Sequence, residues 1–201
     1  AAAHIKGANV VQILDYGIWQ NVPYIAMEYL EGEDLGKRLA RRGKLDARET
    51  AMLVAQVARA LTKAHAMGIV HRDIKPSNIF LCNDPDGEVA KVVDFGIAKS
   101  RSLVIGEGQT RTGALIGTPS YMSPEQVQGN KTVDHRADLW ALGVVVFQCL
   151  TGRLPFESDG FGDLVLLIMA SPPPVPSKIA DVPPGFDAWW ARAAAHTRGG
   201  L

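Results

Sequence analysis

Four polar side chains in the middle of the chain could act together in phosphoryl transfer. Asp73 could accept or orient the proton of an attacking hydroxyl, and Lys75 could sit beside the moving phosphoryl group as a compact cation. Asn78 and Asp94 both supply oxygen, the ligand type that Mg²⁺ prefers. Phosphoryl transfer needs positioning and charge neutralisation more than covalent chemistry from the protein. The residue types and their spacing therefore suit that reaction.

These residues belong to two short blocks, H-R-D-I-K-P-S-N at His71–Asn78 and D-F-G at Asp94–Gly96. We expect Phe95 to pack into the core and fix the direction of Asp94, while Gly96 permits a backbone turn. A solvated turn rich in Asp and Asn is the alternative for either block alone. The presence of both blocks in this order favours a functional site over that alternative.

Short strands are expected on both sides of the first block. Residues 9–15 and 22–28 are β-type runs, and residues 16–21 between them have a hairpin-like pattern. Two further short strands are expected at residues 79–82 and 89–93, around a D-P-D-G turn. The second of these pairs follows the first block directly and leads into the second.

Helices are expected to make up most of the remaining chain. Residues 31–34 should cap a short helix that ends near Gly43. Asp46 and Glu49 form a D-x-x-E capping pattern before a long amphipathic helix, for which Gly68 suits the C′ position. Three more helices are expected, the first of them apolar nearly all round: residues 138–148, 164–170 and 186–195.

Two segments of this pattern are neither helix nor strand. Residues 100–116 are polar, Gly-rich and aperiodic, which is typical of a long loop, and loops of that length are usually functional. Half of the twelve prolines fall between Pro172 and Pro184. That cluster could be a polyproline ligand, but a rigid connection between two helices is the favoured interpretation.

Composition excludes several classes of protein. The 201 residues contain 21 basic and 21 acidic residues, so the net charge of zero gives no indication of nucleic acid or of an anionic membrane surface. Two cysteines form no disulfide framework and no metal site. The longest apolar run, residues 141–150, is too short to span a bilayer, and no signal peptide is visible. The first residue is not Met, and we expect that the front of the protein has been cut away.

Two later motifs make a resemblance specific. Residues 117–125, G-T-P-S-Y-M-S-P-E, resemble the substrate-docking loop of protein kinases, and residues 138–143, D-L-W-A-L-G, resemble their central helix. With the two earlier blocks, four motifs occur in the order of the family. The chain is identified as a member of the Ser/Thr protein kinase family, of the bacterial eukaryotic-like kind. The resemblance implies an α+β protein-kinase-like fold with an N-lobe remnant and hinge at residues 1–30 and a mostly helical C-lobe at residues 31–201.

The resemblance also implies roles for individual residues. Asp73, Lys75, Asn78 and Thr118 would be catalytic, with Lys75 and Thr118 indicating Ser/Thr rather than Tyr acceptors. Asn78 and Asp94 would bind Mg²⁺. The structural roles of the family would fall to five positions: His71, Phe95, Gly96, Glu125 and Asp138.

ATP binding is implied at the expected hinge. Met27 would be the gatekeeper residue, and the backbone of Glu28 and Leu30 would hydrogen-bond the adenine edge. Phe80 would form the apolar floor beneath the adenine, and Lys75 would contact the transferred phosphate. In isolation, Met27 and Phe80 would each more often be core residues.

Regulation is implied at three positions. Arg72, beside Asp73, could pair with a phosphate on the activation loop, where Thr110 and Thr112 lie at the spacing of autophosphorylated residues. Self-association would serve that autophosphorylation. The alternative is that both threonines are ordinary loop residues.

The chain departs from the family in its ATP-clamping elements. It contains no G-x-G-x-x-G, no strand lysine and no helix glutamate of the expected kind, and Lys6 cannot substitute. Arg198 cannot be assigned as the partner of Glu125. We therefore expect this polypeptide alone to show negligible kinase activity.

Three functions remain open. The chain is part of an ATP-dependent Ser/Thr kinase acting on proteins, a truncated kinase-like module that binds or regulates partners without catalysis, or a small-molecule phosphotransferase. The complete set of Asp73, Lys75, Asn78 and Asp94 favours the first over the second, and the expected docking loop argues against the third. Cytoplasmic placement is expected, and a membrane anchor downstream of this segment would be compatible with it.

Overall fold

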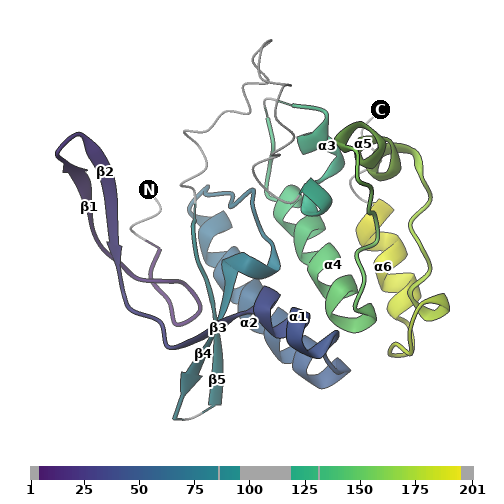
Figure 1. Ribbon diagram of the computed structural model, residues 1–201, viewed down its shortest axis with the longest axis horizontal. Helices are drawn as coiled ribbons and strands as arrows, with labels where there is room; N and C mark the ends of the chain where they lie inside the picture. The colour runs from purple at the N-terminus through teal and green to yellow at the C-terminus, as the bar shows by residue number, and fades with distance from the viewer. Residues whose placement is uncertain (1–4, 86, 96–118, 131, 196–201) are drawn as a thin grey trace.

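The structure is a computed structural model that describes residues 5–85, 87–95, 119–130 and 132–195. Within these residues it contains two small antiparallel sheets and six α-helices. Figure 1 shows the helices gathered in one body, with the first hairpin projecting from it on the side of the N-terminus. This arrangement confirms the α+β class that the sequence predicts.

The hairpin consists of strands β1 (Ile13–Trp19) and β2 (Val22–Met27). The predicted turn at residues 16–21 was too long, because β1 continues to Trp19 and the chain reverses at Gln20 and Asn21. These two residues have φ angles of +48° and +62°, the left-handed conformation that a two-residue hairpin turn requires. Gly17, within the predicted turn, lies inside β1 opposite Tyr24, with that ring packed closely over its Cα.

The second sheet has the order β3 (Gly32–Asp34), β4 (Ile79–Asp84), β5 (Gly87–Val92). Residues 31–34 were expected to cap a helix and not to form a strand, but three of them pair with β4. Gly32 makes this possible: its φ is +145°, and a Cβ built on it would lie 1.9 Å from the Leu81 carbonyl oxygen. Only glycine allows so close an approach of two backbones.

The N-terminal segment is joined to β5 by backbone hydrogen bonds. The Val11 N–H donates to the Val92 carbonyl at 3.1 Å, and the Val92 N–H donates to the Asn9 carbonyl at 2.9 Å. The buried Asn9 amide also donates to Ala90 O and to Gln56 Oε1. These bonds fix the N-terminal segment against the strand that leads to Asp94.

Helices α1 (Leu35–Arg42) and α2 (Ala47–Ala66) begin at the caps that the sequence predicts. Asp34 accepts from the Lys37 N–H at the start of α1. At the start of α2, Asp46 and Glu49 form a reciprocal capping box. After α2, Gly68 adopts a φ of +70°, the left-handed conformation expected beyond a helix end.

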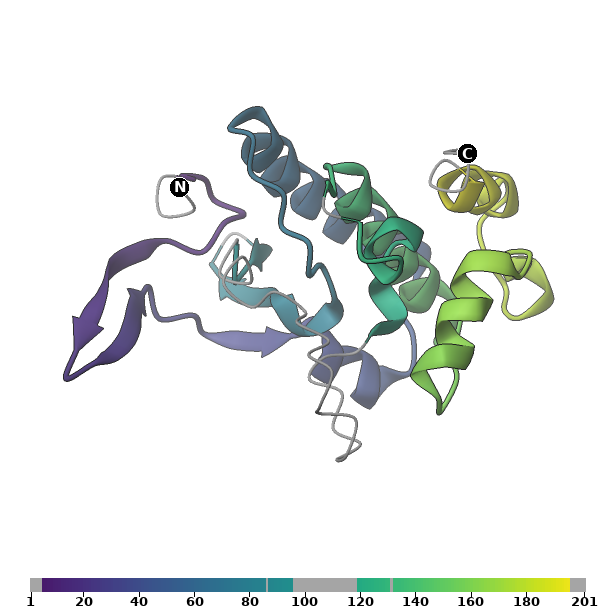
Figure 2. The same cartoon turned by 90° about the horizontal axis from the view of Figure 1, so that it is seen from above.

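Helix α4 (Arg136–Thr151) forms the centre of the helical body, and both views place it between α2 and α6 (Figure 1, Figure 2). Its residues are buried nearly all round, as the apolar pattern predicts. Trp190 of α6 (Phe186–Ala195) packs against Phe147 of α4 with ring centroids 5.0 Å apart. The remaining helices are α3 (Pro124–Val127) and α5 (Phe161–Ala170).

The proline cluster connects α5 to α6 and contains one short 3₁₀ turn, Pro176–Lys178. The Trp190 indole N–H donates to the Pro174 carbonyl at 3.1 Å, which ties the connection to the core. The interpretation as a rigid connection therefore agrees with the structure. None of the helices in the described ranges is both long and apolar enough to cross a membrane.

Candidate active site

Lys75 and Asn78 converge on one oxygen of Asp73. Lys75 Nζ lies 2.8 Å from Asp73 Oδ2, and Asn78 Nδ2 donates to the same oxygen at 3.0 Å. Asn78 Nδ2 also donates to the Asp73 backbone carbonyl at 2.7 Å. The 3₁₀ turn Pro76–Asn78 brings the amide back over Asp73. Both contacts fall on Oδ2, so Oδ1 of this half-exposed carboxylate is the oxygen that can face a hydroxyl.

Asp138 of α4 holds the backbone that precedes Asp73. Its side chain is fully buried, and it accepts the N–H groups of His71 at 2.9 Å and Arg72 at 2.7 Å. His65 Nε2 lies 2.7 Å from the same carboxylate. A buried carboxylate with three hydrogen-bond partners is a stable arrangement, whereas one without them would be costly. The sequence motif at residues 138–143 therefore acts on the Asp73 segment from 65 residues away.

His71 connects the two sequence blocks. Its Nε2 is 2.8 Å from the Val93 carbonyl, and its Nδ1 accepts the Asp73 N–H at 3.2 Å. These partners require a neutral ring with the proton on Nε2. Burial lowers the pKa of His71, although hydrogen bonding to Val93 opposes that shift, so the neutral form is maintained. The ring also meets Phe95 edge to face at a centroid distance of 4.8 Å.

Phe95 is buried, as predicted, while the adjacent Asp94 is exposed. Asp94 and Arg72 have φ angles of +62° and +68°. Left-handed conformations cost energy for residues with a Cβ, and they cluster at functional sites. Here the contacts of the buried residues His71, Phe95 and Asp138 hold the backbone of Arg72 and Asp94 in this conformation.

Asn78 and Asp94, the residues expected to bind Mg²⁺, lie on segments that are joined by a backbone hydrogen bond. The Val93 N–H donates to the Asn78 carbonyl at 3.0 Å, which sets Asp94 beside the Asn78 turn. Both amide hydrogens of Asn78 are directed at Asp73, so its side-chain oxygen is the atom that could bind a cation. One amide and one carboxylate suit Mg²⁺, because this ion keeps several positions for water and phosphate. Within the described ranges, no three His, Cys, Asp or Glu side chains gather as a metal site.

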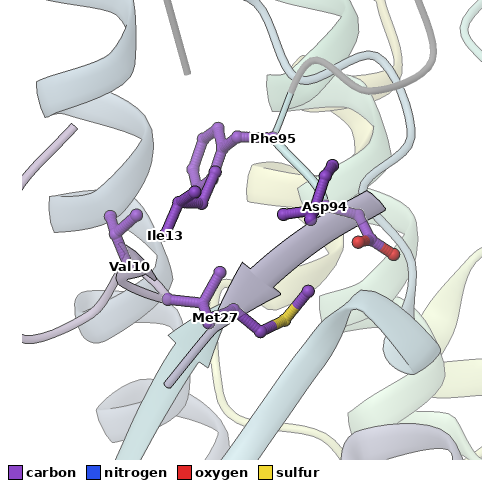
Figure 3. A pocket seen from close by; sticks show the side chains of 7 residues that line it. Val10, Ile13, Met27, Asp94 and Phe95 are labelled. Carbon is purple, nitrogen blue, oxygen red and sulfur yellow. The ribbon is translucent and has the colours of Figure 1, made fainter. Parts of the chain in front are cut away.

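Asp94 and Phe95 also line a small pocket with residues of the hairpin and the N-terminal segment, as Figure 3 shows. Met27, the expected gatekeeper, is among its lining residues, together with Val10 and Ile13. The pocket has a volume of about 10 Å³, room for about one water molecule. This pocket, as the described residues form it, has no room for a nucleotide base.

The expected hinge residues are positioned by a separate set of contacts. The Glu28 N–H donates to the Gln12 carbonyl at 2.9 Å, so the Glu28 carbonyl is the group left to accept from a base. Its carboxylate pairs with Lys91 at 2.6 Å and accepts the Gln12 N–H. Burial would raise the pKa of Glu28, but these hydrogen bonds lower it below its usual value. Leu30 and Phe80 are both half-buried, and Phe80 lies in β4 opposite Lys91.

The segment after residue 118 is joined to the Asp73 segment by Gln126 of α3. Gln126 Nε2 donates to the Arg72 carbonyl at 2.8 Å, and its Oε1 accepts the Ser123 N–H at 3.1 Å. Glu125 is half-buried in the same short helix, and among the described residues no cation forms an ion pair with it. Arg198 lies outside the described ranges. Four other predicted positions also lie outside them: Gly96, Thr110, Thr112 and Thr118.

Three contacts of the site were not predicted. His65 was not predicted to be a site residue, but its Nε2 lies 2.7 Å from the carboxylate of Asp138, 73 residues away. Gln126 and Lys91 were not singled out. Capping patterns and hydrophobic periodicity describe local structure only. They gave no indication that His65, Gln126 and Lys91 contact residues far away in the sequence.

The amino-acid sequence of this chain is similar to those of protein kinases. The family model for the protein kinase domain matches residues 1–171. The chain is 43% identical to serine/threonine-protein kinase pkn3 of Myxococcus xanthus over 183 residues, which cover 89% of this chain and 33% of that protein. It is 44% identical to serine/threonine-protein kinase Pkn1 of the same organism over 172 residues, 85% of this chain and 24% of that protein.

A mycobacterial protein gives a longer match. Serine/threonine-protein kinase PknH of Mycobacterium tuberculosis is 40% identical over 195 residues, which cover 96% of this chain and 30% of that protein. The chain therefore spans between about a quarter and a third of the length of these relatives.

Proposed function

Since this chain belongs to the protein kinase domain family and its relatives include bacterial serine/threonine-protein kinases, we propose that it carries the acceptor and metal side of an ATP-dependent kinase. The substrates are Ser or Thr hydroxyls of proteins. One observation carries this proposal: Lys75 and Asn78 both bind Oδ2 of Asp73 and leave Oδ1 to face an acceptor.

In the proposed reaction the acceptor oxygen forms a bond to the γ-phosphorus of ATP, and the bond from that phosphorus to the leaving ADP oxygen breaks. Asp73 Oδ1 takes the hydroxyl proton. Lys75, 2.8 Å from Asp73, places a positive charge where the acceptor and the phosphoryl group meet. A bound Mg²⁺ would neutralise phosphate charge, and Asn78 and Asp94 are the residues that would hold it.

ATP would be recognised at the hinge. The groups proposed to surround the adenine are Met27, the Glu28 carbonyl, the Leu30 backbone and Phe80. The free Glu28 carbonyl and the half-buried Phe80 support this assignment. Because the chain has no G-x-G-x-x-G, we propose that these 201 residues alone hold ATP too weakly for appreciable turnover.

Arg72 is proposed as a regulatory residue. Its guanidinium donates to the Val133 carbonyl, while its buried Nε has no hydrogen-bond partner among the described residues. A buried N–H without a partner is costly, and a phosphate on Thr110 or Thr112 would satisfy it with a charge-assisted bond. Self-association would bring one copy's threonine to another's site. A phosphopeptide map of the active protein that shows neither threonine modified would remove this assignment.

A binding or regulatory module without catalysis is the second candidate. The small volume of the pocket beside Asp94, about 10 Å³, favours it, because that pocket has no room for a base. A cytoplasmic location is inferred for either candidate, since ATP is present there and both described cysteines are free thiols.

The two candidates differ in a phosphorylation assay with Mg²⁺ and labelled ATP, using casein as acceptor. We expect negligible incorporation by the purified 201-residue chain, and phosphoserine or phosphothreonine from the longest natural polypeptide that carries this sequence. Phosphotyrosine as the product would contradict the Ser/Thr assignment. No incorporation by the longest polypeptide, even when Thr110 and Thr112 are phosphorylated, would favour the binding module.

A further inference from the structure

A groove with a volume of about 570 Å³ lies between the N-terminal segment and one face of α2. Its volume is in the range of ligand-binding pockets. It is distinct from the surroundings of Asp73, and Val10 is the residue that lines both this groove and the pocket beside Asp94. We propose that this groove binds an extended, acidic segment of a partner protein.

The face of α2 in the groove combines short side chains with two cations. Ala55, Ala58 and Thr62 are spaced three and four residues apart, so they share one side of the helix. Arg59 and Lys63 lie on the same side and are both exposed. The short side chains leave open space beside the backbone of α2, and Arg59 and Lys63 lie at the edge of this space.

The positive charge of the groove is not neutralised within the described residues. Neither Arg59 nor Lys63 forms an ion pair there, and the same holds for Lys6 at the adjoining end of the N-terminal segment. The acidic residue Glu88 at the neighbouring β5 is already paired with Arg38. Like charges four residues apart on a helix repel each other, so an anionic occupant would relieve that repulsion.

Hydrogen bonds join the two walls of the groove. Lys63 Nζ donates to the Lys6 carbonyl at 3.2 Å and lies so near Gly7 that a Cβ built there would be 2.7 Å from it. On the other side, Asn9 is bonded to Gln56 of α2 and to Ala90 of β5. A preformed groove reduces the entropic cost of binding.

The spacing of the cations favours a peptide over a compact anion. Residues four apart on a helix have Cβ atoms about 5–6 Å apart, while side chains two apart on an extended strand are about 6.5 Å apart. Carboxylates at alternate positions of an extended segment could therefore meet Arg59 and Lys63 in turn. A single phosphate would need donors that converge on one point, and these two follow one another along α2.

The test is fluorescence anisotropy with the purified chain and a fluorescein-labelled ten-residue peptide that alternates Glu and Thr. We expect saturable binding that weakens with salt. The double variant Arg59→Glu/Lys63→Glu should bind about tenfold more weakly or worse, since each exposed ion pair contributes up to about 1 kcal/mol. Arg48→Glu, an exposed site on α2 outside the groove, is the matched control and should bind within about twofold of the unaltered chain.

A second variant separates the groove from general charge attraction. Ala55→Trp keeps every charge but fills the groove, and we expect it to abolish binding while the circular dichroism spectrum is unchanged. A peptide that alternates Gln and Thr should not bind. Equal binding by the double variant, equal loss in Arg48→Glu, or displacement of the peptide by millimolar inorganic phosphate would overturn the proposal. Self-association of the chain through this face, seen as a mass that falls on Arg59→Glu, would also overturn it.

Discussion

The buried carboxylate of Asp138 accepts the backbone N–H of His71 at 2.9 Å and so joins α4 to the segment that carries Asp73. The same carboxylate also binds the Arg72 N–H and His65. The side chain of Asp138 therefore positions the segment that carries Asp73 relative to the central helix. Both ends of this contact are buried, so water cannot replace either partner.

Asp138→Asn should lower the free energy of unfolding by about 3 kcal/mol, because the amide can accept at one position only and its NH₂ group would face a backbone donor. Urea denaturation followed by circular dichroism measures the loss. Asp134→Asn, an exposed change in the segment before α4, is the control and should stay within about 0.5 kcal/mol. Equal stability of the two variants would mean that Asp138 does not anchor the segment.

The pH dependence of stability should report on His71. Its pKa in the folded protein is lowered by burial, so below about pH 6.5 the unfolded chain binds a proton that the folded protein does not. The stabilisation from neutral His71 is therefore present above that pH and is lost as the pH falls toward the lowered pKa. His71→Phe should show a smaller loss of stability between pH 6.5 and 5 than the unaltered chain. An identical slope in His71→Phe and in the unaltered chain would contradict the assignment.

Metal binding should depend on Asn78 and Asp94. In titrations of the longest natural polypeptide that carries this sequence with Mn²⁺ and ATP, followed by electron paramagnetic resonance, we expect Asn78→Ala and Asp94→Ala each to weaken binding at least about tenfold, because each removes one of the two proposed protein oxygen ligands. The exposed Asp181→Asn is the control. If both variants bound Mn²⁺ as the unaltered chain does, the metal would be held elsewhere.

Substitution of Gly32 should destabilise the fold far more than substitution of Gly162. Gly32→Ala would place a Cβ 1.9 Å from the Leu81 carbonyl oxygen at a φ of +145°, so β3 must separate from β4. We expect a loss of about 2 kcal/mol or more. Gly162→Ala in α5 meets nothing within 4 Å and should stabilise the chain by up to about 1 kcal/mol. Thermal melting curves of the two variants compare them directly, and a tolerated Gly32→Ala would show that β3 is not required for the fold.

Local features of the fold were predictable from the sequence, whereas distant contacts were not. The Asp46–Glu49 capping box and the bounds of α6 follow from residue types a few positions apart. The turn of the first hairpin was predicted too long, because β1 continues to Trp19; Gly17 lies where the ring of Tyr24 packs, which depends on the opposite strand. The boundary near residue 30 between the hairpin and the helical body stays a prediction.

In the candidate site, too, some residues could be predicted from the sequence and others could not. Asp73, Lys75 and Asn78 are close in the chain and were found by their spacing, and the structure brings them together. Asp138 was assigned by resemblance to a family, and the structure supplies its contacts. His65 and Gln126 could not be predicted, because their partners lie 73 and 54 residues away and nothing local indicates the pairing.

The central claim is that Asp73 accepts the proton in phosphoryl transfer to a protein hydroxyl. The most direct test is the kcat of casein phosphorylation by the longest natural polypeptide that carries this sequence, compared between Asp73→Asn and Asp181→Asn. We predict that Asp73→Asn lowers kcat by about 10²–10⁴-fold, the usual contribution of a general base, and that Asp181→Asn leaves it unchanged. A kcat for Asp73→Asn within about twofold of the unaltered protein would contradict the account.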